Sequence, residues 1–212
     1  MYLPNHFENA DEAQLLGTIA EFPFGALVVN GPQGLDANHI PFFVDRRPGE
    51  PARLIAHVAR ANPLWKEARP GEDALVMFRA DDAYVSPNWY PGKHEHHRLV
   101  PTWNYRVVHV HGRLHVHDDV RFVRGVVARL TKFHESRTGS DRPWKMTDSA
   151  PEFIDQMLAN IVGLEVEIVR MVGKWKLSQN RERRDLEGAA KELRDRGQTS
   201  LADAMLATLQ KP

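Results

Sequence analysis

Three short segments of the chain combine cationic or amide donors with small or aromatic side chains. They are residues 57–63, 100–105 and 176–181, and each stands at the end of a strand-like run. Segments this polar do not belong in a core, so together they indicate the lining of one ligand site. Donors beside small and aromatic surfaces suit a planar compound that carries a phosphate group.

The first segment, residues 57–63 (HVARANP), has the donors best suited to a phosphate. Ala59 and Ala61 are small enough for a ligand to approach the backbone, while His57, Arg60 and Asn62 supply donors. The alternative is a loop in which Asn62 caps the start of a helix. Both interpretations are open from the sequence alone.

The other two segments supply aromatic and amide groups. Trp103 and Asn104 precede a strand and could stack on and hydrogen-bond a ring system. Ser86 lies between a strand and an aromatic pair, a position that equally well describes a packed turn. The predicted cofactor contacts are therefore His57, Arg60, Asn62, Ser86, Thr102, Trp103, Asn104, Lys176, Ser178 and Asn180.

The chain has eleven histidines, which could ligate a metal, but their placement argues against a metal site. Four of them share one face of a predicted strand over residues 106–117, and His94, His96 and His97 form a second group. An exposed strand face is where polar residues belong, and a metal needs ligands that converge from several elements. A surface role is the expectation; the alternatives are a metal site or a contribution to another ligand. No serine has the Gly-x-Ser-x-Gly setting of a hydrolase nucleophile.

Composition limits the function classes further. The 212 residues are 42% hydrophobic, which indicates a globular protein, and 28 basic residues balance 28 acidic ones. Such a neutral chain offers no bulk field for a polyanion, so direct DNA binding is not supported by charge. The absence of cysteine excludes thiolate chemistry. No apolar stretch is long enough to span a bilayer, and the start lacks a signal-peptide layout, so we expect a cytoplasmic protein without membrane contact.

Hydrophobic periodicity predicts strands with a few flanking helices rather than strict alternation. No Gly-x-Gly-x-x-Gly motif and no phosphate-binding loop are present, so the pattern favours an α+β or barrel arrangement. Strands are expected over residues 24–30, 38–44, 54–58, 74–78, 106–117 and 163–177. Helices are expected over residues 11–22, 118–139 and 151–158, with two short helices over 185–209 that form a hairpin.

Several of these motifs, in this order, resemble the PaiB family of FMN-binding proteins, which are described as negative transcriptional regulators. The resemblance rests on residues 1–7, 23–24, 39–41, 57–63, 83–87, 100–109 and 176–181. Two features depart from the family pattern. Asn88 stands where the family has serine before Trp-Tyr, which puts Asn88 in doubt as a site residue. The histidine-rich residues 94–98 have no counterpart in it.

The resemblance implies an FMN-binding split β-barrel of about six antiparallel strands, with flanking helices and a C-terminal helical hairpin. Residues 1–182 would form the barrel domain, and residues 183–212 a helical extension packed on it. The cofactor would be FMN, held between the subunits of a homodimer, with His57, Arg60 and Asn62 on its phosphate and the remaining predicted residues near the flavin or the interface.

Three functions are compatible with these observations. The first is a dimeric negative transcriptional regulator or flavin-linked sensor. It lacks a helix-turn-helix signal, although Arg181, Arg183, Arg184 and Lys191 make a local basic stretch. The second is an FMN-dependent oxidoreductase or a relative of the haem-degrading split-barrel enzymes, for which no catalytic residue is identifiable. The third is a metal or haem binder that uses the histidine strand.

Overall fold

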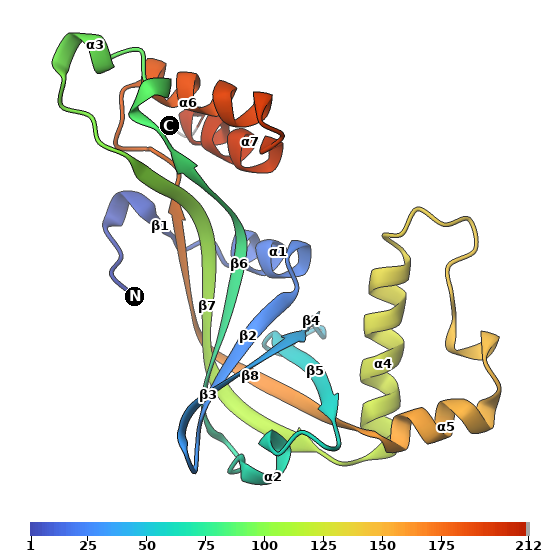
Figure 1. Ribbon diagram of the computed structural model, residues 1–212. Helices are drawn as coiled ribbons and strands as arrows, with labels where there is room; N and C mark the ends of the chain where they lie inside the picture. The colour runs from blue at the N-terminus through green and yellow to red at the C-terminus, as the bar shows by residue number, and fades with distance from the viewer. Residues whose placement is uncertain (211–212) are drawn as a thin grey trace. The chain divides into compact units, whose positions relative to one another are not determined.

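The computed structural model describes residues 1–210, and within them the side chains of His94 and His96 lie outside the described part. The chain divides into two compact units. The first unit comprises Met1–Glu21, Arg79–Val108 and the chain from Val172 onward, and the second comprises Phe22–Phe78 and His109–Met171. Three long strands, β6 (Glu72–Val85), β7 (Thr102–His117) and β8 (Ile161–Lys176), contribute to both units (Figure 1).

The second unit is built on a curled antiparallel sheet. Its other strands are β2 (Phe24–Gly31), β3 (Gly34–Pro41), β4 (Phe43–Asp45) and β5 (Arg53–Ala59). The strand order is β3-β2-β6-β7-β8-β5-β4, so β3 and β4 lie at the two edges. Strands β2 and β3 form a hairpin, and β5 pairs with β4 on one side and with β8 on the other.

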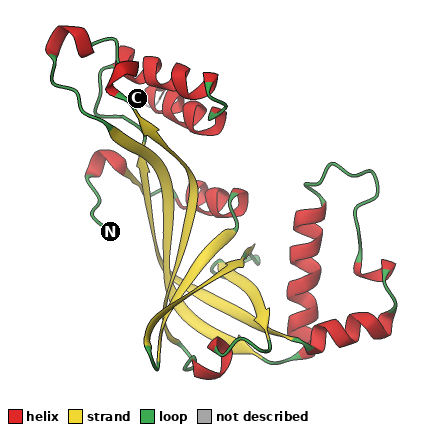
Figure 2. Cartoon of the chain, viewed as in Figure 1, coloured by secondary structure: helices red, strands yellow, loops and turns green. Residues whose placement is uncertain are grey.

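The helices of the second unit include α2 (Leu64–Glu67), α4 (Val120–Glu135) and α5 (Pro151–Ala159), with a 3₁₀ turn at Met146–Asp148 (Figure 2). Asp119 starts α4, because its carboxylate accepts a hydrogen bond from the Phe122 amide at 2.8 Å. Apolar residues at helical spacing then bury Val126 and Leu130 of α4 against Ile55 of β5.

The first unit holds the two ends of the described chain. It contains a 3₁₀ turn at Asn5–Phe7, β1 (Glu8–Asn9), α1 (Glu12–Glu21), a 3₁₀ turn at Pro87–Trp89, α3 (Lys93–His96), α6 (Arg183–Asp195), α7 (Thr199–Ala207) and a last 3₁₀ turn at Thr208–Gln210. Gly197, with φ of 81°, makes the turn between α6 and α7 that other residues adopt with strain. These two helices bury Leu193 and Met205 in one cluster with Val85 and Leu177.

The α+β class, the flanking helices and the C-terminal helical hairpin are as the sequence predicted. The structure has eight strands where about six were expected, but β1 has two residues and β4 has three. The single strand expected over residues 38–44 is divided between β3 and β4, which pair with different strands, so that prediction was wrong. The prediction was also wrong on two strand lengths. Strand β6 continues past residue 78 to Val85, and β7 begins at Thr102 rather than 106. The sequence did not indicate that β6 continues, because aspartate residues such as Asp81 are typical of turns. In the structure Arg106 donates two hydrogen bonds to the Asp81 carboxylate, at 2.8 and 2.7 Å.

The predicted division at residues 182 and 183 stays a prediction, and residues 211–212 of the predicted extension lie outside the described chain. Within residues 1–210, no helix combines the length and the apolar character needed to cross a bilayer.

Candidate functional site

Arg60, the first predicted phosphate ligand, is held by groups of the protein itself. Its guanidinium donates to both carboxylate oxygens of Asp118, at 2.9 and 2.5 Å, and to the carbonyl of Ala159 at 2.7 Å. These hydrogen bonds lower the pKa of the Asp118 carboxyl. In this structure Arg60 therefore ties the end of β5 to the residues that follow β7 and α5, and its role on a phosphate stays a prediction.

Asn62 and His57 also have tasks within the second unit. The Asn62 side chain accepts a hydrogen bond from the Leu64 amide at 2.9 Å and donates one to Asn38 at 2.6 Å. Asn62 thus belongs to the turn that leads into α2, whose N-cap is Pro63 without a side-chain cap. His57 is half-buried beside Met157 and Ile161, and burial lowers the pKa of its imidazole, which disfavours the charged form that a phosphate would prefer.

In the first unit the structure brings four of the predicted residues together in pairs. The Lys176 ammonium donates a hydrogen bond to the Thr102 hydroxyl, and the Asn104 amide donates one to the Ser178 hydroxyl at 2.8 Å. Asn104 is fully buried, and Ser178 has φ of 67°. Burial gives the Asn104–Ser178 pair a structural role at the end of β8.

Three further predicted residues of the first unit are not gathered into one cluster. Trp103 is 53% exposed and packs edge-on against Tyr84, with ring centroids 6.2 Å apart. The Ser86 hydroxyl accepts a hydrogen bond from the Asn88 amide at 3.2 Å, which makes it part of a packed turn. Asn180 is exposed in the turn before α6. The contacts of these residues with a cofactor stay predictions.

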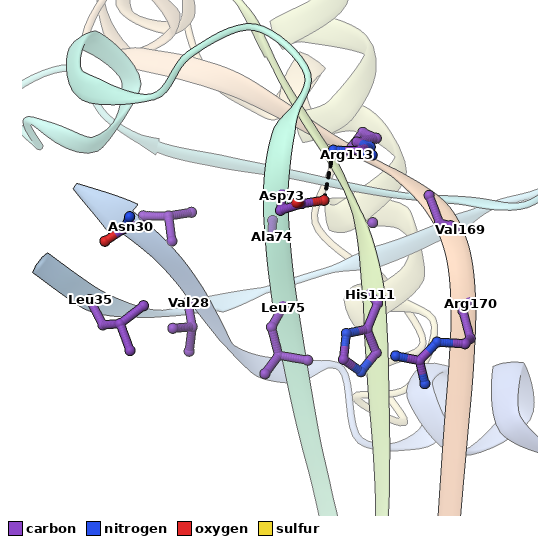
Figure 3. A pocket seen from close by; sticks show the side chains of 12 residues that line it. Val28, Asn30, Leu35, Asp73, Ala74, Leu75, His111, Arg113, Val169 and Arg170 are labelled. Carbon is purple, nitrogen blue, oxygen red and sulfur yellow. Dashed lines mark ion pairs between the residues drawn. The ribbon is translucent and has the colours of Figure 1, made fainter. Parts of the chain in front are cut away.

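A groove of about 600 Å³ runs across the sheet of the second unit (Figure 3). Its lining comes from β2, β3, β6, β7 and β8 and is largely apolar, with Val28, Leu75 and Val169 beside Leu35 of the edge strand. Leu35 is 80% exposed and Val169 is 64% exposed. Large apolar side chains that stay exposed beside a hollow are typical of a binding surface.

The polar part of the groove holds one cation that has no counter-charge among the described residues, Arg170. His111 and Arg170 extend from neighbouring strands toward the same side of the sheet (Figure 3). Burial, followed by the charge of Arg170, lowers the pKa of His111. Within residues 1–210 neither side chain makes an ion pair or hydrogen bond, whereas Arg113 binds Asp73 at 2.7 Å. A cation without a counter-charge beside an apolar surface can hold an anionic group of an otherwise apolar ligand.

Gly112 allows the strands that carry these two residues to approach closely. A Cβ atom at this position would lie 2.3 Å from the carbonyl oxygen of Glu167 on β8, so no larger residue fits there without movement of the backbone. In the sequence His111 is only one histidine of a polar strand face, and neither Arg170 nor the apolar residues of the groove were predicted as site residues. The available signal was the pair Val169-Arg170, which stands where β8 changes the phase of its alternation.

Comparison with known proteins identifies the family. The sequence pattern of the family described as "Putative FMN-binding domain" matches residues 1–170. The chain belongs to this FMN-binding family. Its cofactor is FMN, as the resemblance to the PaiB family implied.

Two relatives show how far the similarity extends. "Protease synthase and sporulation protein PAI 2" of Bacillus subtilis is 28% identical over 195 residues, which is 92% of this chain and 90% of the relative. "Uncharacterized protein YKL070W" of Saccharomyces cerevisiae is 33% identical over 156 residues, which cover 65% of this chain and 92% of the relative.

Solved structures share the fold at low sequence identity. The conserved hypothetical protein Rv2991 from Mycobacterium tuberculosis has a TM-score of 0.59 at 14% identity and covers 86% of this chain and 94% of its own. The FAD and heme binding protein from Mycobacterium smegmatis has a TM-score of 0.54 at 19% identity, with 80% and 73% covered. The split-barrel architecture predicted from the sequence is confirmed.

The residues of the groove on the sheet fit FMN. The flavin ring system is planar with apolar faces, and Val28, Leu75 and Val169 offer a surface of that kind. Arg170 would hold an anionic group at one side of it, and a neutral His111 imidazole could donate a hydrogen bond to the same group. FMN supplies redox chemistry when bound, while the protein supplies binding, orientation and electrostatics.

Proposed function

We propose that this protein is a dimeric, FMN-dependent regulator of the PaiB type in which FMN lies in the groove on the sheet of the second unit. The observation that carries the proposal is the combination of an apolar surface with Arg170, a cation that has no counter-charge within residues 1–210. His57, Arg60 and Asn62, which were predicted to hold the phosphate, already bind groups of the protein or lie against apolar side chains.

A second copy of the chain would complete the site. Leu35 and Val169 flank the groove and expose large apolar side chains. Removing such a side chain from water stabilises an assembly by about 1.5–3 kcal/mol when it is fully buried. A partner packed on this face would gain that free energy and would exclude water from the bound flavin. We therefore propose a homodimer with FMN at the subunit interface.

Regulation would not depend on direct contact between the C-terminal helices and DNA. Arg183 of α6 pairs with Glu187 at 2.8 Å, and Lys191 pairs with Asp195 at 2.6 Å. Paired cations release few counterions from a phosphate backbone, and the net charge of the chain is zero. We propose that the protein acts in the cytoplasm through a partner that responds to the flavin. The name of the Bacillus subtilis relative links that relative to protease synthesis and sporulation.

Titration with FMN tests the cofactor site. We expect FMN fluorescence to change on binding and Arg170→Gln to weaken affinity about tenfold, which corresponds to about 1.4 kcal/mol. Arg121→Gln is the matched control, because Arg121 is an exposed cation on α4 outside the groove. Equal affinities for the wild type and Arg170→Gln would remove the groove as the phosphate site. Steady oxidation of NADH by the FMN-loaded protein would favour the oxidoreductase alternative.

The mass of the protein in solution tests the dimer. We expect light scattering to give twice the chain mass of 24.2 kDa. Leu35→Glu should give monomers and weaken FMN binding, because it places a charge in the proposed interface. A Leu35→Glu protein that stays dimeric and keeps its FMN affinity would contradict the arrangement.

A further inference from the structure

A second hollow, of about 360 Å³, lies in the second unit where α4, α5 and the end of β5 meet, and we call it the α5 hollow. Ile154 and Leu158 of α5 line it with side chains that are buried in the small hydrophobic cluster between α4 and α5. Trp144, Phe153 and Met157 also line it, and their side chains are exposed. The α5 hollow shares no lining residue with the groove on the sheet.

The exposed part of the lining suits a flat aromatic ring. Phe153 and Met157 are four residues apart on α5, so they lie side by side on one face of the helix. Trp144 is held near the end of α4, because its backbone N–H donates a hydrogen bond to the Glu135 carboxylate at 2.8 Å. Met146 supplies a second thioether. Aromatic rings pack well against other rings and against methionine sulfur.

The α5 hollow offers no charge to a ligand. None of the described residues in its lining is an acid, a lysine or an arginine, and burial lowers the pKa of His57, which keeps its imidazole neutral at pH 7. The Asn160 amide already donates to the Gln156 carbonyl at 3.0 Å. A charged compound would lose hydration in this hollow without gaining a counter-charge, so the lining favours an uncharged ligand.

His57 supplies a hydrogen-bond donor to this apolar lining. Its Nδ1 atom is buried without a hydrogen-bond partner, whereas Nε2 is not fully buried and makes no hydrogen bond within residues 1–210. A neutral imidazole carries its proton on one nitrogen only. A buried N–H without a partner is rarer in proteins than a buried acceptor without one, so the proton belongs on Nε2. An acceptor oxygen of a ligand can therefore bind there.

We propose that the α5 hollow binds an uncharged, flat aromatic compound that carries a carbonyl group, at a site separate from FMN. The ring lies against Trp144, Phe153 and Met157, and the carbonyl oxygen accepts a hydrogen bond from Nε2 of His57. Pockets for small ligands have volumes from about 300 Å³ upward, so a hollow of about 360 Å³ accommodates a compound of one or two fused rings.

Equilibrium dialysis of the FMN-loaded protein against 2-acetylnaphthalene tests the proposal. We expect saturable binding at one site per chain. The anion 2-naphthoate has the same ring system and should bind about tenfold more weakly, because its charge finds no partner in the lining. The proposal is overturned if 2-acetylnaphthalene does not bind or if 2-naphthoate binds as tightly.

Replacement of His57 tests the hydrogen bond. His57→Phe keeps a ring but removes the donor, and should lower the affinity for 2-acetylnaphthalene about fivefold. The same variant should bind 2-ethylnaphthalene, which has no carbonyl oxygen, at least as tightly as the wild type does. His57→Gln, which keeps an N–H donor, should lose less affinity for the ketone. Equal effects of His57→Phe on both compounds would contradict the assigned role of His57.

A pair of variants on α5 tests the location. Met157→Glu places a charge in the lining and should lower the affinity for 2-acetylnaphthalene about tenfold. Gln156→Glu is the matched control, because Gln156 is the exposed neighbouring residue outside the lining. Its affinity should equal that of the wild type. Equal loss in both variants would overturn the proposed position of the ligand.

Competition separates this site from the cofactor site. Saturating 2-acetylnaphthalene should leave FMN bound, and Met157→Glu should bind FMN as the wild type does. Arg170→Gln, which tests the groove on the sheet, should keep its affinity for 2-acetylnaphthalene even where it loses FMN. Displacement of FMN by 2-acetylnaphthalene would show one shared site and would overturn the inference.

Discussion

Two basic helices of this protein, α6 in the first unit and α4 in the second, differ in how many of their cations meet a carboxylate, although Arg124 of α4 also pairs with Asp155. On α6, Arg183 and Lys191 meet carboxylates four residues further along the same helix, and Arg184 meets Glu95 at 2.6 Å. On α4, Lys132 meets no acid among the described residues, and Arg129 lies 3.9 Å from an aspartate that other arginines already occupy.

The difference shows that the density of basic residues does not identify an anion site. The stretch from Arg181 to Lys191 has closely spaced basic residues, but acidic residues stand between them at helical spacing. Helix α4 carries Arg121, Arg124, Arg129 and Lys132, and its only acid is Glu135 in the last turn. The position of the carboxylates, rather than the number of cations, decides which helix can bind an anion.

The largest expected effect is on the free energy of unfolding, when a buried carboxylate is compared with an exposed one. Asp45→Asn removes a buried charge that faces Arg53, whose side chain is 20% exposed, and should lower the free energy of unfolding by about 2 kcal/mol. Asp195→Asn removes an exposed partner of Lys191 and should change it by less than about 0.5 kcal/mol. Urea denaturation measures both values. Equal costs would mean that the two regions do not differ in how their ion pairs stabilise the fold.

A second experiment removes the acids that pair with the cations of α6. The double variant Glu187→Gln, Asp195→Asn frees Arg183 and Lys191 of α6 without changing a cation. We expect affinity for duplex DNA to rise about tenfold and the salt dependence to steepen by about two phosphate contacts. Anisotropy of a labelled duplex at several salt concentrations measures both. If the wild type already binds duplex DNA and Arg183→Gln abolishes that binding, the claim that carboxylates neutralise the cations of α6 is wrong.

The smallest expected effect comes from pH and is confined to the second unit. Burial is the main cause that lowers the pKa of His57, His109, His111 and His117 below 6.5. Below pH 6.5 the unfolded chain binds protons that the folded chain does not, so stability falls with acidity until the lowered pKa values are passed. Amide exchange protection of β5 and β7 should therefore decrease between pH 7 and 5.5.

His57→Gln provides the control for this prediction. Glutamine does not titrate, so the variant should lose part of the pH dependence that is measured in β5. Protection in α6, corrected for intrinsic exchange, should change less than protection in β5. A pH dependence that is equal in both helical and strand regions, and unaltered by His57→Gln, would point to another group.

Much of the fold follows from local patterns in the sequence. Asp11, at the start of the helix expected over residues 11–22, has a residue type that caps helices, and its carboxylate accepts a hydrogen bond from the Gln14 amide at 3.0 Å. Gly31 and Gly34 are the last paired residues of the β2–β3 hairpin, and glycines so close together are typical of a turn. Ion pairs such as Lys191 with Asp195 can also be predicted, because residues four apart lie side by side on a helix.

The candidate site could not be predicted from local patterns. Val28, Leu75 and Val169 look like ordinary strand residues, and only the strand order β2-β6-β7-β8 places them around one groove. Arg60, Asn62, Asn104 and Lys176 have suitable donors, but these donors already bind groups of the protein. Arg60 binds Asp118, 58 residues further along the chain, and no spacing rule predicts that partner.

The sequence by itself determined the family, the cofactor class, the succession of helices and strands and the neutral charge, because each depends on residue type and short spacing. The tertiary structure alone decided which donors remain free for a ligand. A hydrogen-bond donor satisfied by a distant carboxylate or carbonyl has little left to offer a phosphate, and only the folded chain shows whether Arg60, Arg170 or Lys132 has such a partner.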